Sequence, residues 1–443
     1  MAQADALSMA TQSGAYRRIC RRELTQDDDR GTMKLLFLTG NLPYPPTDGW
    51  KIRVFSLVRG LARRHEVTVV SFMRRIDDAL AVEQLRDHGI AVHVLPRESR
   101  YSPVTLAQGL LGKTAFPILN YRDDRMTRLL RQVMQQDDFD LIQSESLHMA
   151  QYCLALAHPT VLDLHNIESL LMKRYAKQEQ NPMKRLYAEI TWRKLATYER
   201  EVCGRFTHCL TCSDEERVLL QTRSRVERVS VIPNGVDIDA HSVESWPTHQ
   251  TPQSGERIVF VGRMDYHANV EGVRWFCRSV WPRIRAARPG AVLQIVGGHP
   301  VPTISRLARA GEIEVTGFVT NVRPYLQEAS VVVVPLRIGG GTRLKILEAL
   351  AMGKAVISTT VGAEGIEAAP SRDLIIADRS DDFADHVVSL LAQPDVRRKL
   401  GEAGRRAVEV RYNWDTIVAS LEDVYEQCLG VHGTPERNAQ YVG

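Results

Sequence analysis

The amino-acid sequence predicts an α/β protein of two doubly wound, Rossmann-like domains that face each other across a cleft. Short apolar runs alternate with helix-length amphipathic stretches, which is typical of a parallel sheet covered by helices on both faces. The alternation restarts after a polar segment at residues 239–256 that is rich in Ser, Thr, Pro and Gln. With 443 residues, the chain is long enough for two to three domains of ordinary size.

Composition excludes several classes of protein. Apolar residues make up 44% of the chain and charged residues 25%, as in an ordinary globular protein and unlike a disordered or fibrous one. The formal net charge of +4 is too small to indicate a nucleic-acid-binding protein. No apolar run approaches the roughly 18 residues that span a bilayer. We therefore expect a cytoplasmic protein that is soluble or peripheral at the inner face of the plasma membrane.

Cysteine usage agrees with a reducing compartment. The seven cysteines are scattered along the chain, unlike the dense disulfide framework of a small secreted domain. Cys209 and Cys212 form a C-x-x-C pair, but no second pair stands at the spacing of a zinc site. We interpret both as buried strand residues, with a metal or redox role as the alternative.

The first predicted domain covers residues 33–235. Residues 1–32 show no apolar periodicity and no apolar core of a signal peptide, so we expect a disordered tail there. Met33–Thr39 then begins abruptly as a buried strand. Further strands are predicted at Val67–Phe72, Ala91–Leu95, Asp140–Gln143, Thr160–Leu164 and Thr207–Leu210.

The second predicted domain covers residues 236–411, with a hinge near Ile232–Asp237. The chain closes with two helices, at Pro394–Arg411 and Trp414–Leu429, and the segment 412–430 can cross back to the first domain. Residues 431–443 are expected to be a disordered tail. Strands of this domain are predicted at Arg257–Val261, Val292–Val296, Ile313–Val315, Val331–Val334, Ala355–Ser358 and Leu374–Ile376.

Ligands of doubly wound sheets bind beyond the carboxyl ends of the strands, and the loop after the first strand is the first candidate. In Asn41–Arg53, Gly49 permits close backbone approach. The amides of the following helix, with Lys51 and Arg53, can then face an anion. A proline-rich turn with solvated charges is the alternative.

A second candidate is the end of the strand at Val259–Val261, which runs into Gly262 and Arg263. A guanidinium can bind phosphate through two hydrogen bonds, and a strand end aims it into the crevice. Many strand ends carry an arginine, so this motif alone is weak. Neither a P-loop nor the glycine signature of a dinucleotide-binding fold follows the first strand of either half.

The strongest candidate is a glycine-rich turn between a strand and a helix. Free backbone amides and the positive end of the helix meet there, which suits a diphosphate. Glu348 lies on a helix otherwise rich in Ala, Leu and Met, and can accept hydrogen bonds from ribose hydroxyls. A loop that only turns the chain is the alternative. The turn and its basic neighbours are Gly339, Gly340, Gly341, Thr342, Arg343 and Lys345.

A polar cluster follows the predicted strand at Thr160–Leu164. It comprises Asp163, His165, Asn166 and Glu168, where the first sheet should open into the cleft. His165 can bind a sugar hydroxyl or carry a proton. The alternatives are a buried structural histidine and, for Asn166, a helix cap.

A basic and aromatic stretch spans Met172–Arg200. It holds eight basic and three acidic residues, with four aromatic side chains between them. A cationic helix with aromatic residues can lie on anionic lipid headgroups. An ordinary solvated helix face is the alternative.

Together these motifs resemble the retaining glycosyltransferases of family 4, which have the GT-B fold. The resemblance covers nearly all of the chain from Met33 to about Leu429. Met264–Tyr266 and Arg343–Lys345 look especially like sugar transferases of bacterial exopolysaccharide gene clusters. The most specific motifs are Ile232–Asp237, Phe260–Arg263, Gln294–Gly298, Val315–Val319, the glycine-rich turn through Glu348 to Gly353, and Val361–Gly362.

The resemblance implies an acceptor-side first domain and a nucleotide-sugar donor domain at residues 236–411. Arg263 would hold the donor diphosphate, Glu348 the ribose and His165 the donor sugar, while the loop at Gly49 would close over phosphate and acceptor. Lys345 joins Arg263 and His165 as a catalytic residue. No metal and no cofactor is expected, because basic side chains and helix amides stabilise the departing nucleotide diphosphate. The acceptor-side candidates are Lys51, Arg53, Asp163, Asn166 and Glu168.

The sequence departs from the family pattern in three places. Family members commonly carry a second glutamate eight residues before the position of Glu348, and Gly340 stands there. A single glycine, Gly49, replaces a common pair. The family's lysine after the Gly-Arg motif is also missing, with Ala268 and Asn269 in that region. We expect Arg343 or Lys345 to supply that charge.

The expected activity is retaining transfer of a sugar from a nucleotide diphosphate donor to a hydroxyl of a glycan, in exopolysaccharide or other cell-surface polysaccharide synthesis. The acceptor is expected to be lipid-linked, and the anionic membrane surface is the partner expected for residues 172–200. Two alternatives stay open. One is a non-catalytic nucleotide-sugar-binding subunit of a polysaccharide assembly complex, which Gly340 favours. The other is a nucleotide-sugar epimerase on the same fold.

Overall fold

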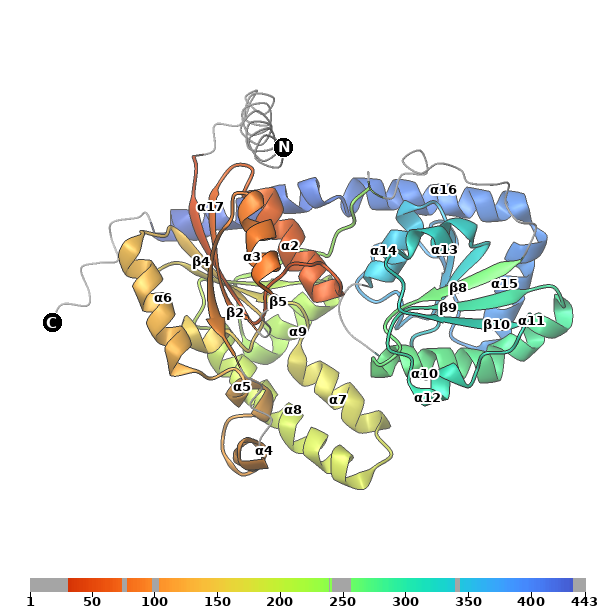
Figure 1. Ribbon diagram of the computed structural model, residues 1–443, viewed down its shortest axis with the longest axis horizontal. Coiled ribbons are helices and arrows are strands. Elements are labelled where there is room, and N and C mark those ends of the chain that lie inside the picture. Colours follow the sequence, from red (N-terminus) through yellow and green to blue (C-terminus); the bar gives the residue numbers. More distant parts are fainter. Residues whose placement is uncertain are drawn as a thin grey trace, which may run out of the picture. The chain divides into compact units, whose positions relative to one another are not determined.

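Two parallel β-sheets form the framework of the computed structural model (Figure 1). The structure describes residues 31–73, 78–97, 103–238, 240, 256–338 and 343–432. The residues from Lys34 onward belong to one compact unit. All elements described below lie in that unit.

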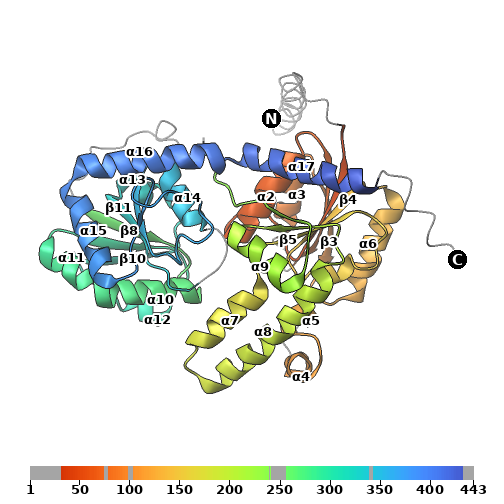
Figure 2. The ribbon, with the colours of Figure 1, turned by 180° about the vertical axis from the view of Figure 1, so that it is seen from behind.

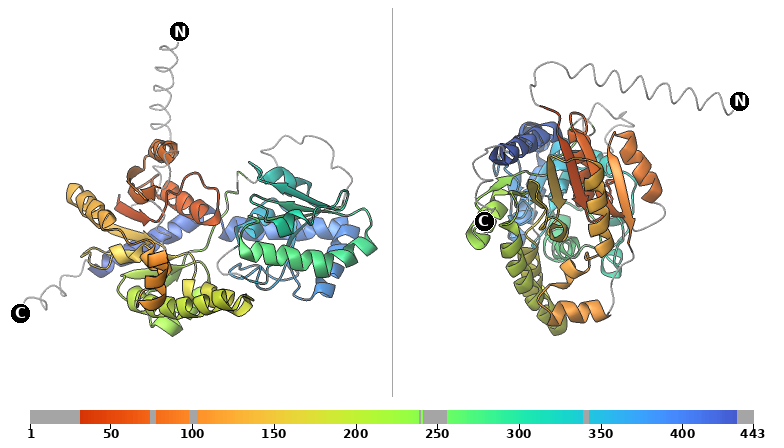
Figure 3. Two further views of the ribbon diagram at one scale, coloured as in Figure 1. Left: turned by 60° about the horizontal axis from the view of Figure 1, so that its bottom comes forward. Right: turned by 90° about the vertical axis from the view of Figure 1, so that its left-hand side faces the viewer.

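Within the described residues, the first sheet has seven parallel strands in the order β3-β2-β1-β4-β5-β6-β7. Helices lie on both of its faces (Figure 3). Its strands are β1 (Lys34–Thr39), β2 (Glu66–Met73), β3 (Ala91–Pro96), β4 (Leu141–Glu145), β5 (Thr160–Leu164), β6 (His208–Thr211) and β7 (Val229–Val231). Its helices are α2 (Gly49–Leu61), α3 (Asp78–Asp87), α4 (Pro103–Leu111), α5 (Phe116–Leu119), α6 (Asp124–Gln136), α7 (Glu168–Gln178), α8 (Pro182–Cys203) and α9 (Asp214–Ser224).

The second sheet, in the described part of the chain, has six parallel strands in the order β10-β9-β8-β11-β12-β13. Its strands are β8 (Arg257–Val261), β9 (Val292–Val296), β10 (Ile313–Gly317), β11 (Val331–Val334), β12 (Ala355–Ser358) and β13 (Ile375–Ile376). The helices that follow its strands are α10 (His267–Trp275), α11 (Trp281–Ala287), α12 (Pro302–Ser305), α13 (Arg323–Glu328), α14 (Leu344–Ala351), α15 (Ser380–Ala392), α16 (Pro394–Arg411) and α17 (Trp414–His432). One turn of π-helix at Phe276–Val280 joins α10 to α11.

The strands form where the sequence places uninterrupted apolar runs. All four valines of β11 are buried, as expected for a central parallel strand covered on both faces. Cys209 in β6 and Cys212 are both fully buried, as predicted, but Cys212 lies one residue beyond the strand and not in it. The edge strand β7 was not predicted, because three residues are too few to show a pattern.

Within the described residues, each sheet has one switch point, where the chain connections from two neighbouring strands run to helices on opposite faces of the sheet. These lie between β1 and β4 in the first sheet and between β8 and β11 in the second. Ligands of such sheets bind at the carboxyl ends of the strands at these points. The loop after β1 leads into α2 at Gly49, and the loop after β8 carries Arg263, so two of the predicted segments leave the sheets there.

The last helix, α17, packs on α2 of the first sheet. A Cβ added to Gly60 of α2 would lie 2.6 Å from Cγ2 of Val418, so the two helices touch closely at this glycine. The buried carboxylate of Glu422 pairs with Arg64 at 2.8 Å and with His65 at 3.1 Å. The chain therefore returns to the first sheet after α16, and Figure 2 shows α17 beside α2 from behind.

None of the helices in the described residues combines the length and the apolar character that crossing a bilayer requires.

Candidate functional site

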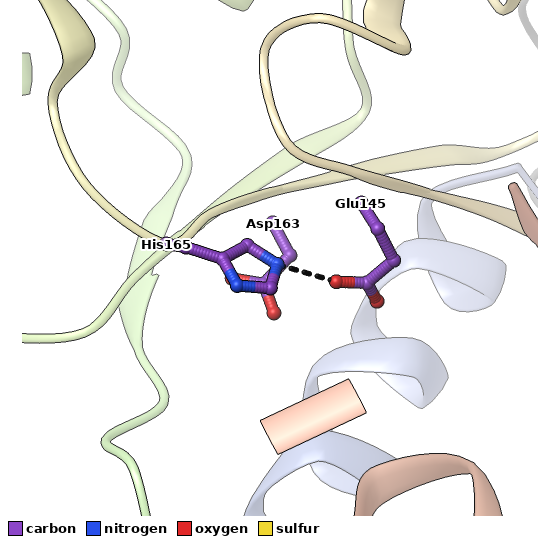
Figure 4. Close-up of side chains that lie close together, drawn as sticks. All are labelled: Glu145, Asp163 and His165. Atoms are coloured by element: carbon purple, nitrogen blue, oxygen red, sulfur yellow. Dashed lines mark hydrogen bonds and ion pairs between the residues drawn. The ribbon is translucent and has the colours of Figure 1, made fainter. Parts of the chain in front are cut away.

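Polar side chains gather at the carboxyl ends of β4 and β5. Glu145 ends β4 opposite Asp163 of β5, and His165 follows that strand directly. Ligand-type atoms of the three side chains lie within 4.8 Å of one another (Figure 4). Nε2 of His165 is 2.6 Å from Oε2 of Glu145, and the imidazole stacks on the ring of Trp50 with centroids 6.2 Å apart. The first turn of α2 thus contacts His165 through Trp50.

Glu145 is absent from the residues that the sequence predicts. The strand was expected to end at Gln143, whereas β4 continues to Glu145, and both side chains are fully buried. Two polar residues spaced two apart in an apolar strand point to the same face. This spacing was the signal that could have found Glu145.

Arg53 and Asp163 form a buried ion pair. Nε and Nη2 of Arg53 donate to the two carboxylate oxygens of Asp163 at 2.9 and 3.1 Å, and each residue is at most 1% exposed. Nη1 donates to the carbonyl of Pro233 and to Oδ1 of Asn234, at 2.9 and 3.2 Å. The pair ties α2 and β5 to the predicted hinge. This burial corrects the expectation that the two side chains face an acceptor.

The remaining acceptor-side candidates lie at the starts of α2 and α7. Gly49 begins α2, and the side chain of Asp48 caps the helix by accepting from the backbone N–H of Lys51 at 3.2 Å. The N-cap of α7 is Ile167, so the helix-cap alternative for Asn166 is wrong. Glu168 is the first residue of α7, and burial raises its pKa to about 7 while His165 opposes that rise.

At the carboxyl end of β8, two glycines allow the backbone to pack closely. Gly297, after β9, has a φ of +144°, and a Cβ there would lie 1.9 Å from the carbonyl oxygen of Gly262. A Cβ on Gly262 would in turn lie 2.7 Å from Nδ2 of Asn269 and 2.8 Å from Nζ of Lys345. Side chains are therefore excluded where β8 and β9 end, and polar groups from α10 and α14 fill that place.

Lys345 reaches this point from the first turn of α14. Its Nζ donates to Oδ1 of Asn269 at 2.7 Å and lies 4.4 Å from the ring centroid of Phe260. Burial lowers the pKa of Lys345 to about 7, with a further contribution from Arg343. Burial also raises the pKa of Glu348, one helical turn later, to about 7. Burial therefore disfavours the charged form of both Lys345 and Glu348.

Arg263 lies at the outer edge of the same site. Its exposed guanidinium pairs with Asp265 through Nε and Nη2, at 3.1 and 2.7 Å, and the hydrogen bond to Asp265 raises its pKa. Its carbonyl accepts from Nδ2 of Asn269 at 2.8 Å, which connects it to Lys345. Arg343 is the N-cap of α14, and burial lowers the pKa of its guanidinium.

The glycine-rich turn predicted to hold a diphosphate falls outside the described residues. The residues of this turn that lie outside the described ranges are Gly339, Gly340, Gly341 and Thr342.

Glu145, Asp163 and His165 form a cluster whose atoms are close enough to hold a cation, among the described residues. Both oxygens of Asp163 accept from Arg53, and Oε1 of Glu145 accepts from the amide of Gln143 at 2.7 Å. A cation would have to displace these donors. The cluster therefore fits a hydrogen-bonded network better than a metal site.

Comparisons with known proteins agree with this architecture. Residues 47–240 match the family described as Glycosyltransferase Family 4, and residues 255–393 match the one described as Glycosyl transferases group 1. An uncharacterised protein of the cps region of Klebsiella pneumoniae is 19% identical over 376 residues, covering 80% of this chain and 90% of that protein. A GDP-mannose-dependent alpha-(1-6)-phosphatidylinositol monomannoside mannosyltransferase of Mycobacterium tuberculosis is 36% identical over 157 residues, but only 32% of this chain and 41% of that enzyme are covered.

Solved structures share the fold over nearly the whole chain. Anabaena HepE in complex with UDP has a TM-score of 0.65 at 15% identity, covering 89% of this chain and all of that one. Sucrose-phosphate synthase from Thermosynechococcus elongatus has a TM-score of 0.66 at 16% identity, covering 91% of this chain and 100% of that one. The fold of two facing Rossmann-like sheets is therefore GT-B, as predicted.

Proposed function

Because the chain belongs to the family-4 glycosyltransferases, we propose that it transfers a sugar from a nucleotide diphosphate donor to a glycan hydroxyl with retention of anomeric configuration. The observation that carries the proposal is the convergence of Lys345, Asn269 and Arg263 at the switch point of the second sheet. No metal is required in this proposal, because the cations of the chain stand where the leaving diphosphate would carry its charge.

Lys345 fits the part of the missing family lysine. Asn269 lies in the region where that lysine was expected, and Nζ of Lys345 is hydrogen-bonded to its side chain. The ammonium group of Lys345 on α14 therefore lies beside the position on α10 where the family's lysine is missing. A diphosphate beside it would favour the charged form of the lysine and would in turn be stabilised as it departs.

We propose that Arg263 is the second cation that binds the diphosphate. Its ion pair with Asp265 is exposed, and such pairs contribute little to stability. A diphosphate can therefore replace Asp265 as the partner at small cost. Glu348 lies one turn from Lys345 on α14, where we propose that it accepts hydrogen bonds from the ribose.

His165 and the loop at Gly49 form the opposite part of the proposed site. A Cβ on Gly49 would lie 3.3 Å from Cδ1 of Leu344, so the start of α2 adjoins the start of α14. We propose that His165 binds a hydroxyl of the donor sugar. Lys51, Asn166 and Glu168 stay candidates for contacts with the acceptor. Same-face attack by the acceptor would give retention.

The acceptor is proposed to be a lipid-linked glycan of a cell-surface polysaccharide. Support comes from the similarity to the Klebsiella pneumoniae protein of the cps region. HepE binds UDP, and the mycobacterial relative is described as GDP-mannose-dependent, so the comparisons do not single out one donor base.

The helical pair α7 and α8 is the proposed membrane-facing surface (Figure 2). At the start of α8, Met183 is 81% exposed and Leu186 is 62% exposed, beside the basic residues of the stretch. On α4, Leu111 is 90% exposed, and Lys194 of α8 holds α4 by donating to the carbonyls of Gly109 and Leu110. Exposed apolar side chains among cations suit an anionic lipid surface.

A turnover assay without acceptor tests the proposed function. Purified protein is incubated with UDP-, GDP- and ADP-sugars, and slow release of the nucleotide diphosphate is measured. We expect release from one nucleotide family, lost in Lys345→Met and retained in Lys399→Met, which removes an exposed lysine of α16. Binding without release would favour the non-catalytic subunit. Conversion of the donor sugar without release would favour the epimerase.

A further inference from the structure

A chain of buried hydrogen bonds connects the last helix to His165. The hydroxyl of Tyr425 on α17 donates to Oε1 of Gln143 at 2.6 Å. Nε2 of Gln143 donates to Oε1 of Glu145 at 2.7 Å, and Oε2 of Glu145 lies 2.6 Å from Nε2 of His165. Tyr425, Gln143 and Glu145 are all 0% exposed. The chain thus runs through the first sheet from α17 to the switch point.

Each link of this chain has a defined direction. A carboxylate can only accept, so both oxygens of Glu145 receive hydrogen bonds. The amide of Gln143 is held with its nitrogen toward Glu145, because its oxygen accepts from the Tyr425 hydroxyl. The remaining oxygen of Glu145 then requires a proton on Nε2 of His165.

We infer that Glu145 is a positioning residue that fixes the ring of His165 with its Nε2–H toward the carboxylate, with Gln143 and Tyr425 fixing Glu145 in turn. In the neutral ring, Nδ1 is then the unprotonated nitrogen and can accept a hydrogen bond from a sugar hydroxyl. The inference rests on the proposed function in one respect, the assignment of His165 to the donor sugar.

The surroundings of the imidazole favour this single state. Trp50 stacks on one face of the ring and limits its rotation. Asp163 is bound on both oxygens by Arg53, so it does not compete with Glu145 for the imidazole. Burial lowers the pKa of the neighbouring His148 to about 4, and that ring stays neutral beside His165 at neutral pH.

This chain of hydrogen bonds also gives α17 a role beyond packing. Tyr425 lies 282 residues after Gln143 in the sequence, yet its hydroxyl fixes the orientation of the amide. Without that hydroxyl the amide of Gln143 can rotate, and its oxygen would then repel the carboxylate of Glu145. A change on the last helix is therefore expected to alter the orientation of His165.

The test is histidine nitrogen NMR of the full chain, selectively labelled, with the His165 signal assigned from its absence in His165→Gln. It is read without substrate on wild type, Glu145→Gln, Tyr425→Phe and Tyr412→Phe. Tyr412→Phe is the matched control, because its buried hydroxyl accepts from the N–H of Glu367 and lies outside the chain. Thermal unfolding confirms that each variant is folded.

We expect the Nε2–H tautomer in wild type and Tyr412→Phe, and a mixture of tautomers in Glu145→Gln and, to a smaller extent, in Tyr425→Phe. Donor hydrolysis should fall roughly 10- to 100-fold in kcat in Glu145→Gln, with little change in donor KM. An Nδ1–H tautomer in wild type, or the wild-type tautomer in both Glu145→Gln and Tyr425→Phe, would overturn the inference. Because the tautomer is read without substrate, a protein that shows the expected tautomer but no turnover would contradict the proposed function alone.

Discussion

Nζ of Lys345 donates a hydrogen bond to Oδ1 of Asn269 at 2.7 Å, joining residues 76 positions apart. Asn269 belongs to α10 and Lys345 to α14, the helices that follow β8 and β11 at the switch point. The contact brings a desolvated ammonium group to the end of β8, beside Gly262. Its charge state should therefore respond to any anion bound there.

Binding of a nucleoside diphosphate should take up protons. Burial lowers the pKa of Lys345 to about 7, so the lysine is about half neutral at pH 7 in the unliganded protein. A bound diphosphate favours the charged form, so the affinity should fall as the pH rises from 7.5 to 9, by up to about tenfold per unit. Calorimetry of the tightest binder among UDP, GDP and ADP, in buffers of different ionisation enthalpy, measures both effects.

The control for this pH dependence is Lys345→Arg. A guanidinium stays charged through this range, so the variant should lose the proton uptake and the slope. An unchanged slope in Lys345→Arg would assign the pH dependence to another group.

Substituting Gly297 should disrupt the second switch point. In Gly297→Ala, the new Cβ would lie 1.9 Å from the carbonyl oxygen of Gly262, at a φ of +144° that favours glycine. We expect the free energy of unfolding to fall by about 3 kcal/mol or more, and nucleotide binding to weaken. Urea denaturation measures the first effect. Gly290→Ala is the control, because its Cβ would meet open space, and equal effects of the two changes would contradict the account.

Breaking the ion pair between Arg53 and Asp163 should destabilise the first sheet strongly. Asp163→Asn leaves the guanidinium of Arg53 buried beside a neutral amide, and the loss of one partner of a buried pair costs about 3–5 kcal/mol. Asp415→Asn removes the same kind of carboxylate from the exposed pair with Arg63, where about 1 kcal/mol or less is expected. Urea denaturation measures the free energy of unfolding of both variants. A loss in Asp163→Asn no larger than in Asp415→Asn would contradict the stabilising role of the Arg53–Asp163 pair.

Removing exposed apolar side chains near α8 should weaken membrane binding. Leu111→Ser and Met183→Ser together should lower binding to vesicles containing phosphatidylglycerol by roughly tenfold or more, because each loses the burial of an apolar side chain in lipid. Added salt should also weaken vesicle binding by the wild-type protein, because it screens the attraction between the basic residues and anionic lipid. Val410→Ser, at a 72% exposed site on α16, is the control. Binding that ignores salt and anionic lipid would contradict the proposed surface.

The sequence predicts the two sheets well, because central parallel strands are buried on both faces and appear as uninterrupted apolar runs. The bounds of β5, β8, β9, β11 and β12 agree with the predicted ones residue for residue. The three-residue strand β7 leaves no such run and was missed.

Chemistry at the site was harder to predict, because it depends on contacts distant in sequence. Glycines and basic residues at strand ends identify the second switch point, but only the structure shows that Lys345 reaches Asn269. The sequence also gave no reason to pair Arg53 with Asp163, since 110 residues separate them. Both were therefore interpreted by residue type alone, as acceptor contacts.

Donor binding by the site around Lys345 and Glu348 is tested most directly by thermal shift, because a ligand that binds the folded state raises its melting temperature. UDP, GDP, ADP and their common sugars are compared with and without a metal chelator. The account predicts a shift with one nucleotide family that survives the chelator and disappears in Glu348→Ala. No shift with any of them, or an equal shift in Glu348→Ala, would contradict it.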